Sequence, residues 1–112
     1  MAKYEGNLRG DFNEILRTVN NAVMGGSASA TLEDSSDFNN GTVRCAVRVY
    51  ERYSWSGGNR VSLNVTLISS SDDVFISAIA SGGSQAVLFK VNTLGEEAFL
   101  ETLSSALRKY EV

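Results

Sequence analysis

Apolar and polar residues alternate along residues 42–55 in a way typical of a β-strand with one buried face. One parity carries Val43, Cys45, Val47, Val49, Glu51, Tyr53 and Trp55, and the other carries Arg44, Ala46, Arg48, Tyr50, Arg52 and Ser54. Residues 61–68 alternate again, with Val61, Leu63, Val65 and Leu67 opposed to Ser62, Asn64, Thr66 and Ile68. We therefore expect two strands whose more apolar parity faces a core.

The turn between these two strands determines which of their faces coincide. A two-residue loop at the glycine pair 57–58 would put Val49 opposite Thr66 and would separate the two apolar sets. A three-residue loop, either 56–58 or 57–59, brings the odd-numbered residues of the first strand onto the apolar face of the second. We predict the three-residue loop.

Two further strands follow the same pattern. The first has an inward face made of Val74, Ile76, Ala78 and Ala80. It follows a turn at Ser70-Ser71, which can widen to four residues while keeping the same phase. The glycine pair 82–83 then predicts a two-residue turn into a strand over residues 84–91. The expected pairs are Ala80 with Gln85, Ala78 with Val87, Ile76 with Phe89 and Val74 with Val91.

The N-terminal segment predicts a strand followed by a helix. Residues 2–8 alternate weakly and form the strand. Asp11 and Glu14 make a capping-box-like pair, and Gly25-Gly26 marks the end of the helix. The apolar positions that follow at helical spacing are Phe12, Ile15, Leu16, Val19 and Val23.

Residues 27–32 alternate between small polar and small apolar side chains and predict another strand. We expect residues 33–37 to form a loop or a bulge. A type I′ turn at Asn40-Gly41 would put Leu32 opposite Val49 and would keep the apolar faces in phase.

The C-terminal segment predicts a second helix, with Thr93 and Glu96 as its capping box. Its apolar stripe comprises Phe99, Leu100, Leu103, Ala106, Leu107 and Tyr110. The expected fold is α+β: a single antiparallel sheet of about six strands, in the chain order β-α-β-β-β-β-β-α, with both helices packed on one face. We expect one domain over residues 1–112.

This order of elements is similar to that of the helix-grip and TATA-binding-protein-like families, a topological likeness that implies no function. The segment V-R-C-A-V-R-V-Y-E-R-Y and the G-G-S-Q-A-V turn give the chain a resemblance to a family of small uncharacterised bacterial proteins. That resemblance implies no assigned activity, catalytic residue or cofactor.

The amino-acid composition excludes several kinds of catalytic and metal-binding site. The chain has no histidine and a single cysteine, Cys45, so histidine-based catalytic sets and clustered cysteine or histidine metal sites are excluded. We predict no catalytic residue, metal or cofactor, and an inward Cys45 that acts as a small hydrophobic residue. The net charge of −3 argues against general nucleic-acid binding. The sequence shows neither a signal peptide nor a membrane span, and we expect a cytoplasmic protein.

Glu51 breaks the alternation, because it is a carboxylate at an inward position. It could line a pocket between the helices and the sheet together with Tyr53 and Trp55, and there it could bind a small, partly apolar ligand or transfer a proton. The alternatives are that this end of the hairpin extends beyond the helices into water, or that a bulge near Tyr50 resets the parity.

Arginines recur on the opposite parity. Arg44, Arg48, Arg52 and Arg60, with Tyr50 among them, could bind a phosphate or a polyanion. The alternative is a solvated sheet face whose charges are balanced by nearby acids.

The same outward face becomes apolar on the later strands, at Ile68, Phe75, Ile79, Ala86 and Leu88. An apolar sheet face needs a cover. The predicted cover is a second copy in a twofold homodimer, with Ile68, Phe75, Ile79 and Leu88 as interface residues. The alternatives are a different protein partner, or helices divided between the two faces.

The leading functional prediction is a non-enzymatic binding or interaction domain that forms a homo-oligomer through the outward face. A pocket protein for a small molecule, with an acid-base role for Glu51, is the second hypothesis. Nucleic-acid or polyanion binding by the arginines is the third. The absence of a catalytic set disfavours an enzyme.

Overall fold

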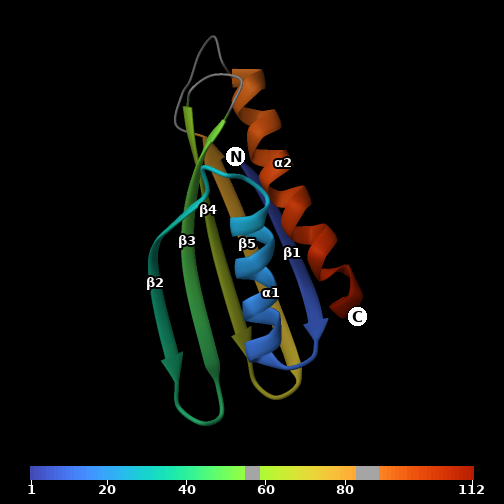
Figure 1. Ribbon diagram of the computed structural model, residues 1–112. Coiled ribbons are helices and arrows are strands. Elements are labelled where there is room, and N and C mark those ends of the chain that lie inside the picture. Colours follow the sequence, from blue (N-terminus) through green and yellow to red (C-terminus); the bar gives the residue numbers. More distant parts are fainter. Residues whose placement is uncertain (55–58, 83–88) are drawn as a thin grey trace.

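The computed structural model describes residues 1–54, 59–82 and 89–112, which form five strands, two α-helices and a short 3-10 helix (Figure 1). The elements are β1 (Ala2–Arg9), α1 (Phe12–Gly25), β2 (Thr31–Asn39), β3 (Arg44–Ser54), β4 (Asn59–Ser69), β5 (Asp73–Gly82), α2 (Phe89–Leu107) and η2 (Arg108–Tyr110). The α+β class is therefore confirmed.

The strands form one antiparallel sheet in the order β1-β5-β4-β3-β2. The prediction of a sixth strand over residues 84–91 is wrong in the part that the structure describes, because Phe89 and Val91 belong to α2. The edge of β5 that this strand was expected to occupy is taken by β1. The observed pairs are Ala80 with Ala2, Ala78 with Tyr4, Ile76 with Gly6 and Val74 with Leu8.

The β4–β5 hairpin keeps the predicted phase. Ser69 pairs with Val74, so the connection is the four-residue form of the turn that the sequence allowed. Leu67 consequently lies opposite Ile76, and both side chains are fully buried.

The connection between β3 and β4 is one residue longer than predicted. Ser54 pairs with Asn59, so four residues separate the strands instead of three. An even-numbered connection reverses which face of β3 joins the core. Tyr50 and Ala46 are buried beneath the helices, and Cys45, which was expected there, lies on the other face.

Strand β2 also departs from the prediction. It spans Thr31–Asn39 and so includes the segment 33–37 that was expected to be a loop or bulge, with the bulge confined to the step between Leu32 and Asp34. Leu32 pairs with Tyr50 rather than Val49. Every residue of β2 is exposed, so this edge strand has no buried face that its sequence could reveal.

Helix α1 forms as predicted. The Asp11 carboxylate accepts a hydrogen bond from the Glu14 backbone N–H at 2.9 Å, which caps the first turn. Both helices lie on one face of the sheet, with α2 along the side of β1 (Figure 1). The buried apolar cluster between the helices and the sheet contains Leu8, Phe12, Ile15, Val19, Val23, Ala46, Tyr50, Val61, Leu63, Val65, Leu67, Val74, Ile76, Ala78, Ala80, Phe99, Leu100, Leu103 and Leu107.

Helix α2 begins at Phe89, four residues before the predicted start at Thr93. Glu96 is therefore inside the helix, where it does not serve as part of a capping box. It is 4% exposed, accepts a hydrogen bond from the Gly82 backbone N–H, and lies 2.7 Å from the amino group of Met1. Its carboxylate thus ties α2 to the end of β5 and to the start of the chain.

The observed register predicts that two neighbouring residues of β3 contribute very differently to the stability of the fold. Tyr50 is fully buried and donates a hydrogen bond to Asn20 at 3.1 Å, so Tyr50→Ala should lower the free energy of unfolding by about 3–5 kcal/mol. Val49 lies on the opposite face, and Val49→Ala should cost about 1 kcal/mol or less. Urea denaturation of both variants measures the difference. A larger loss from Val49→Ala would mean that the reverse parity is correct.

Candidate functional site: the open face of the sheet

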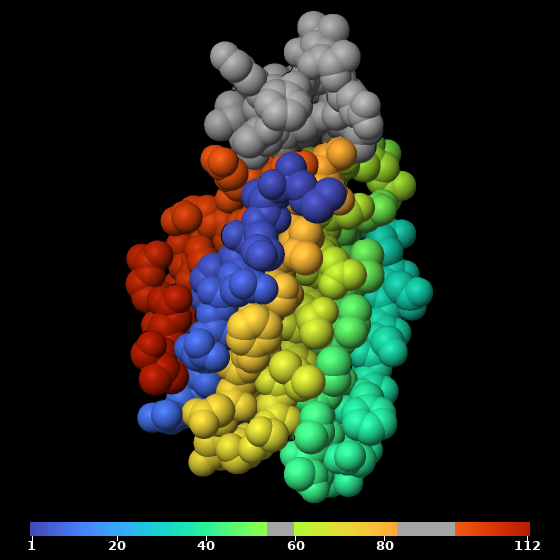
Figure 2. Space-filling model, turned by 180° about the vertical axis from the view of Figure 1, so that it is seen from behind, coloured from blue at the N-terminus to red at the C-terminus, as the bar shows by residue number. Residues whose placement is uncertain are grey.

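The face of the sheet turned away from the two helices is called the open face here. In Figure 2, which views the molecule from behind, the described parts of all five strands lie side by side on this face, and α2 appears only beyond β1. The residues that share it alternate with the core residues along each strand. They include Lys3, Glu5, Asn7, Asp34, Ser36, Phe38, Cys45, Val47, Val49, Glu51, Arg60, Ser62, Asn64, Thr66, Ile68, Phe75, Ser77, Ile79 and Ser81.

One row of residues crosses four strands of this face and is apolar throughout. Phe38 pairs with Cys45, Cys45 with Ile68, and Ile68 with Phe75. These four residues are called the apolar row. Phe38 is 56% exposed, Ile68 42% and Phe75 38%. Large apolar side chains in one continuous row are typical of a surface that another molecule covers.

Further apolar side chains extend this surface along the strands. Ile79 is 39% exposed, and Val47 and Val49 are half-buried. A hollow of about 310 Å³ adjoins one end of the apolar row, where Asn7, Ile68 and Phe75 form part of its lining.

The structure brings together three of the four predicted interface residues, because Ile68, Phe75 and Ile79 share the open face. Leu88 lies outside the described residues. The sequence interpretation missed Phe38, Cys45, Val47 and Val49 as members of this surface. The signal that could have found the three β3 residues is the length of the β3–β4 connection, since an even number of residues there turns this parity of β3 outward.

Glu51 does not lie between the helices and the sheet, contrary to its predicted position. It is on the open face, where its carboxylate forms an ion pair with Arg60 and accepts a hydrogen bond from Ser62 at 3.3 Å. Tyr53, on the same face, is 55% exposed, and Trp55 is outside the described residues. A charged cluster therefore stands at the end of the open face away from the apolar row.

The predicted arginine surface is divided between the two faces of the sheet. Arg44, Arg48 and Arg52 lie on the helix side, and Arg60 lies on the open face. The Arg44 guanidinium is 4.3 Å from the ring centre of Phe12, and that of Arg52 is 4.2 Å from the ring centre of Phe99. Burial lowers the pKa of the Arg52 guanidinium.

Arg48 has a structural role at the edge of the sheet. Its side chain is 16% exposed and lies 3.0 Å from the Asp37 carboxylate. It also donates to the Val47 carbonyl at 2.9 Å and to the Ser36 carbonyl at 3.4 Å. Arg48 thus fastens the exposed strand β2 to β3.

A second hollow, of about 530 Å³, lies between β1 and α2. Tyr4 and Leu100 contribute to its lining, with Glu97 and Glu101 nearby. It is formed by different elements from those that carry Glu51. Among the described residues, no three acidic or cysteine side chains are grouped so that they could hold a metal ion. Over the same residues, neither helix has the length and apolar character needed to cross a bilayer.

The chain belongs to a family of unknown function (DUF6054), whose model matches residues 1–111. The resemblance to uncharacterised proteins is therefore confirmed. No curated protein and no solved structure matches the chain, and the likeness to helix-grip and TATA-binding-protein-like folds is not confirmed.

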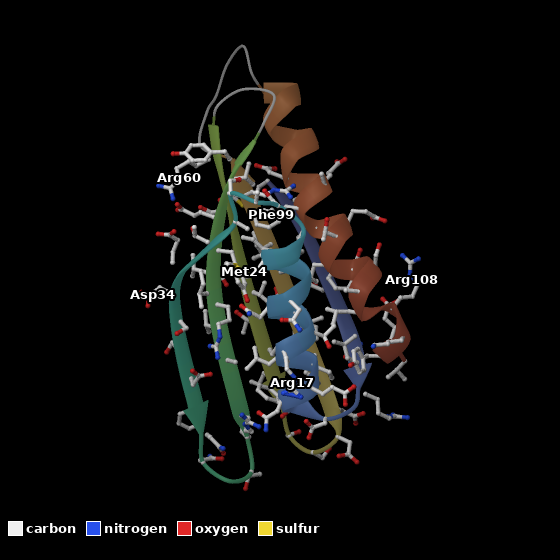
Figure 3. The ribbon with its side chains drawn as sticks, viewed as in Figure 1. Arg17, Met24, Asp34, Arg60, Phe99 and Arg108 are labelled. Carbon is white, nitrogen blue, oxygen red and sulfur yellow. The ribbon has the colours of Figure 1, made fainter. Side chains whose placement is uncertain are left out.

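The contacts of Arg48 predict that its main contribution is to folding. Arg48→Ala should lower the free energy of unfolding by about 1–2 kcal/mol and speed hydrogen exchange in β2, because the Asp37 carboxylate and two carbonyl groups lose their donor. Arg17→Ala is the matched control. It removes the same charge from an exposed position on α1 (Figure 3) and should change stability by about 0.5 kcal/mol or less. Equal effects of the two substitutions would contradict a structural role for Arg48.

Proposed function

We propose that this DUF6054 protein is a non-enzymatic interaction domain that associates with a second copy of itself through the open face. The observation that carries the proposal is the apolar row, which lies on the side of the sheet opposite both helices. Burying these side chains in a dimer would remove apolar surface from water, which is the main driving force of association.

The size of the open face suits a stable dimer. Five strands at about 4.8 Å spacing and about nine residues at about 3.3 Å rise give a face on the order of 700 Å². Stable protein interfaces bury about 800 Å² on each partner. A dimer that used most of this face would therefore fall in the lower part of the standard range, which is about 600–1,000 Å² on each partner.

The composition of the open face also fits an interface. The three inner strands carry Ile68, Phe75, Ile79 and Val49, whereas charges concentrate at the edge strands and around Arg60. An apolar centre with a polar rim is the usual anatomy of a protein interface.

The other two hypotheses have weaker support. A polyanion would meet arginines divided between two faces, of which Arg48 already binds Asp37. A small-molecule ligand is better matched by the hollow between β1 and α2 than by Glu51, which is paired with Arg60. We also propose that the protein is not an enzyme, because its sequence has no histidine and offers no histidine-based catalytic set.

The first test is the effect of a charge in the apolar row. The wild-type protein should have the mass of a dimer in light scattering at micromolar concentration. Phe75→Glu should yield a folded monomer, because a carboxylate would be buried against apolar side chains, and its dissociation constant should rise at least about 100-fold.

Met24→Glu is the matched control. Met24 is 39% exposed, nearly the same as Phe75 at 38%, but it lies on α1, on the helix side (Figure 3). It should leave the dimer intact. A wild-type protein that stays monomeric at high concentration, or a Phe75→Glu variant that remains a dimer, would overturn the proposal.

The single cysteine offers an independent readout of the same surface. Cys45 is half-buried in the apolar row, so alkylation of its thiol should slow as protein concentration rises and the dimer covers it. In Phe75→Glu, the rate should not depend on concentration. A wild-type rate that is constant over the whole concentration range would contradict burial of this row by self-association.

A further inference from the structure

The open face has an internal symmetry that bears on how two copies would meet. Its rows are centred on β4, the middle strand of the five. One row runs Lys3, Ile79, Asn64, Val49, Asp34 across the sheet. Charges of opposite sign thus stand at equal distances from its centre, each separated from the centre by one apolar residue.

We infer that the dimer axis runs along β4, so that Lys3 of each subunit faces Asp34 of the partner subunit. This inference rests on the proposed self-association. A twofold rotation about an axis parallel to β4 keeps every row at its own level and exchanges its two ends. Both ends are accessible: Lys3 is exposed on β1, and Asp34 is exposed on β2 at the outer edge of the sheet (Figure 3). Within its own subunit, the Nζ atom of Lys3 lies 3.8 Å from the Oε1 atom of Glu5.

The same rotation matches the other rows. In the apolar row, Ile68 lies near the axis, and Phe75 faces Cys45 of the partner subunit. Two further acidic residues face neutral partners: Glu5 meets Ser36 of the partner subunit, and Glu51 meets Ser81 of the partner subunit. These matches follow from the strand pairing alone. At the axis itself, Arg60 faces Arg60 of the partner subunit, where ion pairs with Glu33 and Glu51 in each subunit balance its charge.

A twofold axis perpendicular to the strands opposes like charges at two of the levels where it could lie. Centred on the row of Asn64, it would place Lys3 against Lys3 of the partner subunit and Asp34 against Asp34 of the partner subunit. Centred on the neighbouring row of Thr66, it would oppose two copies of Glu5. Facing like charges weaken association and disfavour a given arrangement. The charge pattern therefore favours the axis along β4 over these two placements.

Cross-linking distinguishes the two arrangements. In a Cys45→Ser background, Asn64→Cys and Ile68→Cys should each give covalent dimers with a short bismaleimide, because both positions lie near the axis in sheets about 10 Å apart. Ser36→Cys is the control. Its two copies would lie about 19 Å apart laterally, four strand spacings, and should not cross-link.

Charge reversal tests the predicted pair directly. Lys3→Glu and Asp34→Lys should each raise the dissociation constant about tenfold, since each symmetric dimer contains two such pairs. The double variant should return it to near the wild-type value. Additive weakening in the double variant would contradict contact between these residues.

The outcomes separate this inference from the proposed function. A monomeric wild-type protein would remove both. A dimer that Phe75→Glu dissociates, but in which Asn64→Cys and Ile68→Cys do not both cross-link, would leave self-association standing and overturn the axis along β4.

Discussion

The pairing of Ser54 with Asn59 is the constraint on which the rest of the molecule depends. Because side chains alternate with a period of two, this pairing fixes the face of every residue in β3. It buries Tyr50 against the helices, where burial raises the pKa of its phenol and Asn20 accepts its hydrogen bond. The same pairing turns Cys45 and Val49 to the open face, so the core and the candidate interface are set by one register.

The sequence could not settle that register because β3 is apolar on both faces. Val47 and Val49 lie on one, Ala46 and Tyr50 on the other. The arginines look like solvated residues in a pattern analysis, yet Arg44 and Arg52 extend over the rings of Phe12 and Phe99. Arginine can cover an apolar surface with its methylene stem and guanidinium plane while its charge stays near water. Hydropathy alone assigns such a residue to the wrong side.

Elements with one strongly apolar face were predictable from the sequence. The cap at Asp11 and the buried stripe through Ile15 and Val19 are as expected, as is the phase of β4 and β5. The partners of edge strands were not predictable. β2 is exposed along its whole length, and β1 takes the edge of β5 through contacts remote in sequence. Among the predicted interface residues, Ile68, Phe75 and Ile79 fall on one surface because their strands were read in the correct phase.

Both faces of the sheet carry large apolar side chains, but these side chains have different roles on the two faces. On the helix side, apolar side chains such as Leu67 and Ile76 are fully enclosed, which holds the chain in its fold. On the open face, the apolar pair Ile68 and Phe75 is followed along the strands by the polar pair Thr66 and Ser77, so the face stays compatible with water. A surface of that kind is suited to reversible association, because it gains by being covered without requiring cover in order to fold. In the proposed dimer, the charges at its two edges would decide which way a second copy faces.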